Sequence, residues 1–142
     1  PKVNVIITVS PIRYAKYGYH GSQLSKAVLL LAADKVIKEE GERVYYFPAY
    51  EIVNDELRDY RFYKADMLHP NEQAVEYIWE QLVATCFSAE AKQFLEEWRP
   101  IKEALAHRPF HPEAAAYQDF IKKTKEKAKM LELKYPNIEL NL

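Results

Sequence analysis

Residues 3–9 read Val-Asn-Val-Ile-Ile-Thr-Val, a short β-branched run that is almost continuously apolar. Such a run is typical of a strand that is buried on both faces of a parallel sheet. Ser10-Pro11 ends the run, because proline lacks the backbone N–H that a central strand needs. A second strand is predicted at Val44-Tyr45-Tyr46-Phe47, where Pro48 stops it.

A long helix is predicted between these strands, at residues 22–40. Leu24, Val28 and Leu31 recur at helical spacing. Ser22 is expected to cap the N-terminus of this helix, and Gly41 is expected to end it. The order strand, helix, strand predicts a βαβ unit with parallel strands. The predicted fold class is therefore α/β: part of a flavodoxin-like, three-layer parallel sheet, here one βαβ unit followed by C-terminal helices.

Helices are predicted for most of the remaining chain. A helical turn is expected at residues 50–57, and a longer helix is expected to begin at His69 or shortly after, with Pro70 at its first helical position. The inner face of that helix is predicted to comprise Val75, Ile78, Trp79 and Leu82. The pattern then changes, so the predicted boundary separates an α/β part, residues 1–87, from a helical extension, residues 88–142.

The helical extension is predicted to contain two helical stretches. Ser88 is expected to cap the first, and Pro100 is expected to kink or interrupt it. The last helix is predicted at residues 113–134. Two strands are too few for a stable parallel sheet, so further strands are expected to precede Pro1 in the native protein.

Composition excludes several classes of protein. The chain has 142 residues, 49% of them hydrophobic, and a formal net charge of -1. This length suits about one domain, and the charge gives no bias toward nucleic acid or an anionic membrane. No apolar run approaches the roughly 18 residues of a membrane span, and the N-terminus has no secretory signal pattern. These features predict a cytoplasmic location.

Cysteine and histidine usage gives no indication of a metal or cofactor. Cys86 is the single cysteine, which excludes an internal disulfide, and its apolar surroundings predict a buried thiol. His20, His107 and His111 do not share a helix face with carboxylates at ligand spacing. Neither a metal site nor a cofactor is therefore predicted.

Asp66-Met67-Leu68-His69 places a carboxylate three residues before an imidazole. Histidine is the usual general base near neutral pH, and a neighbouring carboxylate fixes its tautomer and supports its charged form. These two residue types are two members of a Ser-His-Asp triad. Asp66 and His69 are therefore candidate catalytic residues. Taken alone, the pair also fits an ordinary turn before a helix.

Aromatic and basic side chains follow both predicted strands. Loops after parallel strands open on the same edge of a sheet, where α/β proteins bind ligands. Aromatic rings beside a few polar groups would suit a sugar or an acyl ligand. Alternatively, these rings only pack the loops onto the domain. The predicted substrate-binding residues are Ser10, Arg13, Tyr14, Arg61 and Tyr63.

The order of these segments resembles the second half of the SGNH (GDSL-type) hydrolases, and most closely the GSCFA family, a distant bacterial branch of that group. The resemblance covers about the first 85 residues. It depends on Thr8-Val9-Ser10-Pro11, Ser25-Lys26-Ala27, Tyr46-Phe47-Pro48-Ala49-Tyr50-Glu51, residues 55–63 and Asp66-Met67-Leu68-His69-Pro70.

This resemblance implies a serine esterase or deacylase in which His69 is the base and Asp66 is its partner. The nucleophilic serine and most of the oxyanion hole of such enzymes lie in earlier segments. Residues 1–87 thus resemble the C-terminal half of an SGNH-like domain, a fragment expected to be inactive alone. An acylated carbohydrate or small-molecule ester is the implied substrate, and self-association through an exposed sheet edge is expected. The alternative is a non-catalytic interaction domain.

Overall fold

The computed structural model describes residues 3–140 and divides into two compact units, residues 1–85 and 86–142. The first unit opens with β1 (Val5–Ile7), α1 (Gly18–Glu40) and β2 (Val44–Tyr46), with the 3-10 turns η1 (Ala15–Tyr17) and η2 (Gly41–Arg43) at the ends of α1. It continues through α2 (Ala49–Glu51), the π-helical η3 (Ile52–Leu57), the 3-10 turn η4 (Tyr60–Phe62) and α3 (Glu72–Cys86).

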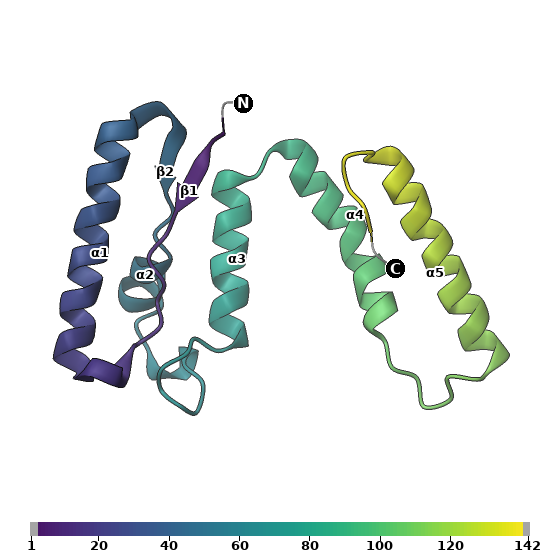
Figure 1. The fold of residues 1–142 in the computed structure, drawn as a ribbon. Helices are drawn as coiled ribbons and strands as arrows, with labels where there is room; N and C mark the ends of the chain where they lie inside the picture. The colour runs from purple at the N-terminus through teal and green to yellow at the C-terminus, as the bar shows by residue number, and fades with distance from the viewer. Residues whose placement is uncertain (1–2, 141–142) are drawn as a thin grey trace. The chain divides into compact units, whose positions relative to one another are not determined.

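The two strands form a parallel pair joined by α1, so the predicted α/β class and βαβ unit are confirmed. Val5 is paired with Val44, and Ile7 with Tyr46. The N–H of Phe47 also donates to the carbonyl of Ile7 at 2.8 Å. In Figure 1 the strand pair lies between α1 and α3. The carboxyl ends of both strands therefore lead into the loops that carry the candidate site.

The strand prediction for residues 3–9 was wrong in length and in burial. Only Val5–Ile7 form strand pairs, because β2 is itself only three residues long, Val44–Tyr46. Val5 is 44% exposed and Ile6 is 48% exposed, whereas only Val9 of the predicted strand is buried. Full burial requires further strands and a covering layer, and the described residues contain only two strands in this sheet.

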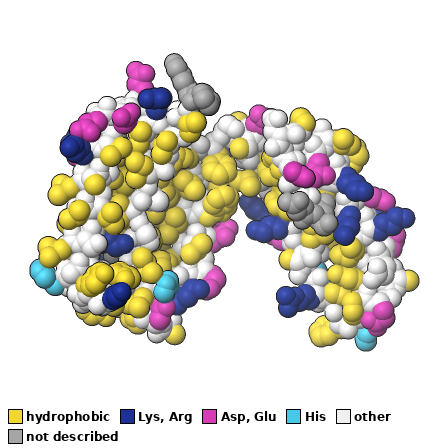
Figure 2. All heavy atoms as spheres, in the orientation of Figure 1, with side chains coloured by type: hydrophobic (Ala, Val, Ile, Leu, Met, Phe, Trp, Pro, Cys, Tyr) yellow, Lys and Arg dark blue, Asp and Glu magenta, His cyan; other side chains and the backbone are white. Residues whose placement is uncertain are grey.

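The long helix begins earlier than predicted. A 3-10 turn leads directly into α1 at Gly18, so Ser22 lies inside the helix and does not cap it. Ser22 and Lys26 are buried, whereas Leu24, Val28 and Leu31 are exposed. These three side chains form an apolar stripe along α1. Figure 2 shows many hydrophobic side chains on the surface of the first unit.

A small core lies between β2, α2 and α3. Phe47, Ala49 and Ile52 are buried, and Ile78 and Leu82 pack against them. The inner face predicted for α3 is thus correct for Ile78 and Leu82 and wrong for Val75 and Trp79, which are exposed. Cys86 was also expected to be buried, but it is exposed at the last residue of α3.

The second unit is a pair of contacting helices, α4 (Ala89–Ala106) and α5 (Ala115–Lys134). Its core comprises Ile101, Ala128, Leu131 and Tyr135. The predicted cap is confirmed, because the Ser88 hydroxyl oxygen accepts from the N–H of Ala91 at 3.1 Å. Pro100 does not end the helix: α4 continues through it to Ala106, and Ile101 in the following turn is part of the core.

The exposed apolar surface of β1 leads to a prediction about association. A strand with one unpaired edge and exposed apolar side chains is a template for pairing with another chain. We expect the 142-residue chain to sediment as dimers or larger species at micromolar concentration, and Ile6→Lys to shift it toward monomer. Gln73→Lys, which adds the same charge on exposed α3, serves as the control. A monodisperse wild-type monomer in analytical ultracentrifugation would contradict this expectation.

Candidate active site

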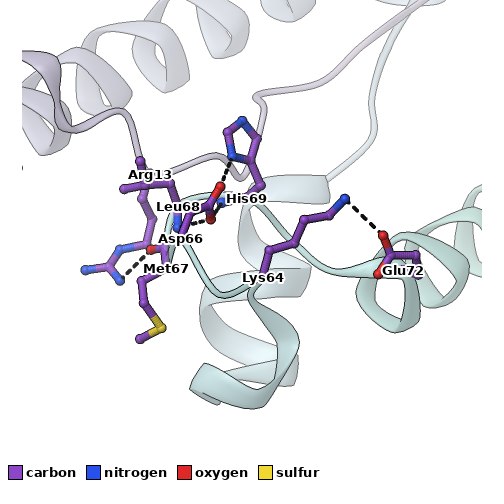
Figure 3. Close-up of polar contacts among 7 residues, drawn as sticks. All are labelled: Arg13, Lys64, Asp66, Met67, Leu68, His69 and Glu72. Atoms are coloured by element: carbon purple, nitrogen blue, oxygen red, sulfur yellow. Dashed lines mark hydrogen bonds and ion pairs between the residues drawn. The ribbon is translucent and has the colours of Figure 1, made fainter.

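Asp66 and His69 form a direct hydrogen bond within one tight turn (Figure 3). Nδ1 of His69 lies 2.6 Å from Oδ2 of Asp66. The other carboxylate oxygen, Oδ1, accepts from the N–H of Leu68 at 2.8 Å and from the N–H of His69 at 3.0 Å. The carboxylate therefore both closes the turn and orients the imidazole ring.

The turn is the tip of a short hairpin that leads from η4 to α3. The N–H of Lys64 donates to the carbonyl of His69 at 2.8 Å, and Tyr63 and Pro70 form an antiparallel bridge. The Lys64 ammonium also pairs with the Glu72 carboxylate at 2.9 Å (Figure 3). This ion pair lowers the pKa of Glu72.

This hairpin explains why α3 begins at Glu72, shortly after His69, and why Pro70 lies before the helix and not at its first position as predicted. The backbone of His69 and Pro70 is occupied by hairpin contacts. Asn71 caps the helix instead, because its side-chain oxygen accepts from the N–H of Ala74 at 3.0 Å. Its amide nitrogen donates to the carbonyl of Arg61 at 2.6 Å, which ties the helix start to η4.

The hydrogen bonds of Asp66 fix its ionisation state. Bonds from the N–H groups of His69 and Leu68, and then the bond from the His69 ring, lower the pKa of Asp66 to about 2. At neutral pH its carboxylate is ionised and can only accept hydrogen bonds. Nδ1 of His69 must therefore carry a proton. When the ring is neutral, its lone pair lies on Nε2, the nitrogen that acts as the base in serine hydrolases.

The lowered pKa of Asp66 predicts how the turn responds to acid. A carboxylate with a depressed pKa stabilises the folded turn above its unfolded pKa of about 3.9, and this contribution is lost as the pH falls through about 2. We expect the Asp66 carboxyl carbon to titrate near pH 2 in a ¹³C NMR experiment on the 142-residue chain. The other charged groups at the turn are Arg13, Lys64 and Glu72. A midpoint near 3.9 would show that the hydrogen bonds are absent in solution.

Among the predicted substrate-binding residues, Arg13 forms hydrogen bonds with the backbone of the turn. Its Nη1 donates to the carbonyl of Met67 at 3.1 Å, and its backbone N–H donates to the carbonyl of Leu68 at 3.0 Å. The guanidinium carbon lies 5.0 to 5.7 Å from three tyrosine ring centres, within the range of cation–π attraction. The three rings belong to Tyr19, Tyr60 and Tyr63.

Tyr63 therefore also lies beside the turn, as its part in the hairpin requires. Its ring is partly buried, and this burial raises the pKa of its hydroxyl. The structure thus brings four of the predicted site residues together: Arg13, Tyr63, Asp66 and His69.

The other three predicted residues make different contacts. The Ser10 hydroxyl oxygen accepts from the N–H of Ile12 at 3.3 Å, in the turn after β1. The Tyr14 ring packs edge-on against Tyr17, with ring centres 5.6 Å apart. The side chain of Arg61 lies over Phe62 and is largely exposed. Within residues 3–140, no hydrogen bond or ring contact joins Ser10, Tyr14 or the Arg61 side chain to Asp66 or His69.

Lys26 belongs to this part of the molecule, although no site role was predicted for it. It is only 7% exposed, and this burial lowers the pKa of its amine. Its ammonium donates to the carbonyl of Ser10 at 2.5 Å and lies 5.8 Å from the Tyr50 ring centre. The sequence signal that could have pointed to Lys26 is its spacing from Ser22: the two polar residues are four positions apart and so share one helix face.

The accessible side of the pair is the Nε2 edge of His69. The His69 side chain is 53% exposed, and no residue in the described range 3–140 forms a hydrogen bond with Nε2. No serine hydroxyl in that range forms a hydrogen bond with the ring. The same residues hold no group of three or more His, Cys, Asp or Glu side chains that could bind a metal ion. The arrangement can accept a proton at Nε2 from a group that approaches from solvent.

Comparison with known proteins agrees with this architecture. Residues 1–82 match the GSCFA family, and residues 98–142 match the C-terminal domain of GSCFA domain proteins. The chain belongs to the GSCFA family, as its sequence resemblance predicted. No curated protein and no solved structure matches it. Within residues 3–140, no helix has the length and apolar character needed to traverse a lipid bilayer.

Proposed function

We propose that His69 and Asp66 are the base and the acid of a Ser-His-Asp triad in a serine esterase or deacylase of the GSCFA family. The observation that supports this proposal is the 2.6 Å contact between Nδ1 of His69 and the Asp66 carboxylate, which leaves Nε2 accessible. In this proposal the serine comes from a segment outside the 142 residues, and these residues alone are inactive.

The chemistry follows from the protonation state of the pair. The serine oxygen attacks the ester carbonyl carbon while its proton moves to Nε2 of His69, which forms an imidazolium and a tetrahedral oxyanion. The Asp66 carboxylate stabilises the imidazolium through Nδ1. The ester C–O bond then breaks, and Nε2 returns the proton to the leaving alcohol. Water attacks the acyl-serine by the same route, releasing the carboxylic acid and regenerating the serine hydroxyl.

The residues around the turn support a proposal about the substrate. Tyr63 and Arg13 lie beside the catalytic turn, and Ser10, Tyr14 and Arg61 lie in the same two loops. Tyrosine rings offer flat apolar faces with a polar edge, and guanidinium groups donate to carbonyl and hydroxyl oxygens. These properties suit an acylated carbohydrate or a similar small ester, with the five residues as its binding surface.

A covalent probe tests the proposal. We expect the full-length protein to react with an alkyl fluorophosphonate, whose phosphorus bonds to an activated serine as fluoride leaves. We expect His69→Ala to abolish this labelling, as measured by intact-protein mass spectrometry. The 142-residue chain should stay unlabelled and should hydrolyse a p-nitrophenyl ester no faster than its His69→Ala variant. Unlabelled full-length protein that also cleaves no ester would contradict the proposal. Histidine-dependent hydrolysis by the 142 residues would place the nucleophile within them.

The exposed apolar surface of the first unit favours a second candidate function, non-catalytic interaction with another protein. Val5 and Ile6 on β1, and Leu24, Val28 and Leu31 on α1, are all exposed. The three α1 side chains recur at helical spacing and form a continuous stripe, and exposed apolar patches mark interaction sites in many proteins. Under this alternative, His69→Ala leaves every activity of the full-length protein unchanged, whereas Val28→Lys weakens the binding of the partner protein.

A further inference from the structure

Met67 and Leu68 are the two residues between Asp66 and His69, and the carbonyl oxygens of both accept hydrogen bonds from Arg13. The side chain of Arg13 donates to Met67 at 3.1 Å, and its backbone N–H donates to Leu68 at 3.0 Å. Arg13 precedes Met67 by 54 residues, so these are tertiary contacts between the loop after β1 and the turn. The conformation of the turn therefore depends on a distant part of the chain.

The turn needs such support because its backbone is unusual. Met67 has a φ of 60°, in the left-handed region that residues with a side chain rarely adopt. A residue in that region persists where surrounding contacts fix it. The hydrogen bond to the Met67 carbonyl acts directly on this residue (Figure 3).

Arg13 is itself held in place from two sides. The rings of Tyr19, Tyr60 and Tyr63 surround its guanidinium at 5.0 to 5.7 Å, which restricts the orientation of the planar group. Ser10 lies three residues before Arg13, and its carbonyl accepts a hydrogen bond from the buried Lys26 ammonium at 2.5 Å. The loop after β1 is thus anchored to α1 before it reaches the turn.

We propose that Arg13 is a positioning residue that holds the Asp66–His69 turn in the geometry that aligns the carboxylate with the imidazole. Its effect on the turn is a property of the 142-residue chain, whereas its effect on catalysis rests on the proposed esterase function. Arg13 acts through the peptide groups of Met67 and Leu68, and its contact with the two catalytic side chains is indirect.

NMR titration of Asp66 tests the proposal without any catalytic assay. We expect Arg13→Gln to raise the midpoint of the Asp66 carboxyl carbon from about 2 toward about 3.9, because the turn loses the alignment of its N–H donors. Arg13→Lys should also raise it, since lysine keeps the charge but loses the planar guanidinium. Arg43→Gln, an exposed arginine that pairs with Glu40, should leave it near 2. An unchanged midpoint in folded Arg13→Gln, or a rise in Arg13→Gln alone, would overturn the proposal.

A measurement on the wild-type chain is independent of whether the variants fold. We expect a scalar coupling through the hydrogen bond between the Arg13 amide nitrogen and the Leu68 carbonyl carbon. Absence of this coupling in the folded chain would also overturn the proposal. If the full-length protein is an esterase, Arg13→Lys should lower its kcat on the order of 10²-fold, as expected for misaligned catalytic groups. Lack of any wild-type esterase activity would contradict the proposed function and leave the NMR tests of Arg13 valid.

Discussion

Replacing His69 with alanine in the full-length protein is expected to lower kcat for ester hydrolysis by on the order of 10⁴- to 10⁶-fold. In the proposed mechanism, the substitution removes the group that accepts the serine proton and returns it to the leaving alcohol. KM should change little, because the imidazole contributes to the transition state and not to ground-state binding. Steady-state kinetics with a p-nitrophenyl ester gives both constants.

A second histidine provides the control for this substitution. His111 is exposed in the second unit, where its ring lies 3.6 Å from the Glu113 carboxylate. It has the same residue type and a neighbouring acid but no part in the candidate site, so His111→Ala should retain wild-type kcat. A His69→Ala enzyme with wild-type kcat would remove His69 from the mechanism.

Replacing Asp66 with asparagine is expected to lower kcat by on the order of 10⁴-fold with little change in the backbone of the turn. The amide oxygen of the new side chain can still accept from the N–H groups of Leu68 and His69. Its NH₂ group, however, would take the place of Oδ2 and donate to Nδ1 of His69. The ring would then carry its proton on Nε2, where the mechanism requires a lone pair.

The matched control for the aspartate is Asp59→Asn. Asp59 lies in the same loop, and its carboxylate also accepts a backbone hydrogen bond, from the N–H of Arg61 at 2.8 Å. Asp59→Asn removes the same charge as Asp66→Asn, but the Asp59 carboxylate has no hydrogen bond to a histidine. We therefore expect kcat to remain within about twofold of wild type, as for a surface substitution. If Asp59→Asn and Asp66→Asn lowered kcat equally, the loss would arise from loop charge or loop folding and not from the histidine tautomer.

The sequence was sufficient to predict the βαβ connection, because strands and helices leave local signals. Proline after each strand, the apolar repeat of α1 and the Ser88 cap all lie within a few residues of the element they define. The GSCFA family assignment was likewise predicted from short ordered segments. The Asp66–His69 contact has the same local character, since a three-residue spacing within a turn can bring the two side chains together.

Features that depend on distant residues were missed or were wrong. Arg13 was predicted to bind substrate, and this stays a prediction; its bonds to Met67 and Leu68 were missed because they join positions that no local pattern connects. Pro70 was predicted at the first position of α3, but its bridge with Tyr63 keeps it before the helix, which begins at Glu72. The burial of residues 3–9 was wrong because burial depends on neighbouring strands and not on strand sequence.

The central claim is that the Asp66 carboxylate holds a proton on Nδ1 of His69 and leaves Nε2 as the base. Two-bond ¹H–¹⁵N correlation NMR of the 142-residue chain, recorded at a pH where the ring is neutral, distinguishes the two tautomers directly. The account predicts a protonated Nδ1 and an unprotonated Nε2 for His69, and loss of this preference in Asp66→Asn. A neutral His69 with its proton mainly on Nε2 in the wild-type chain would contradict it.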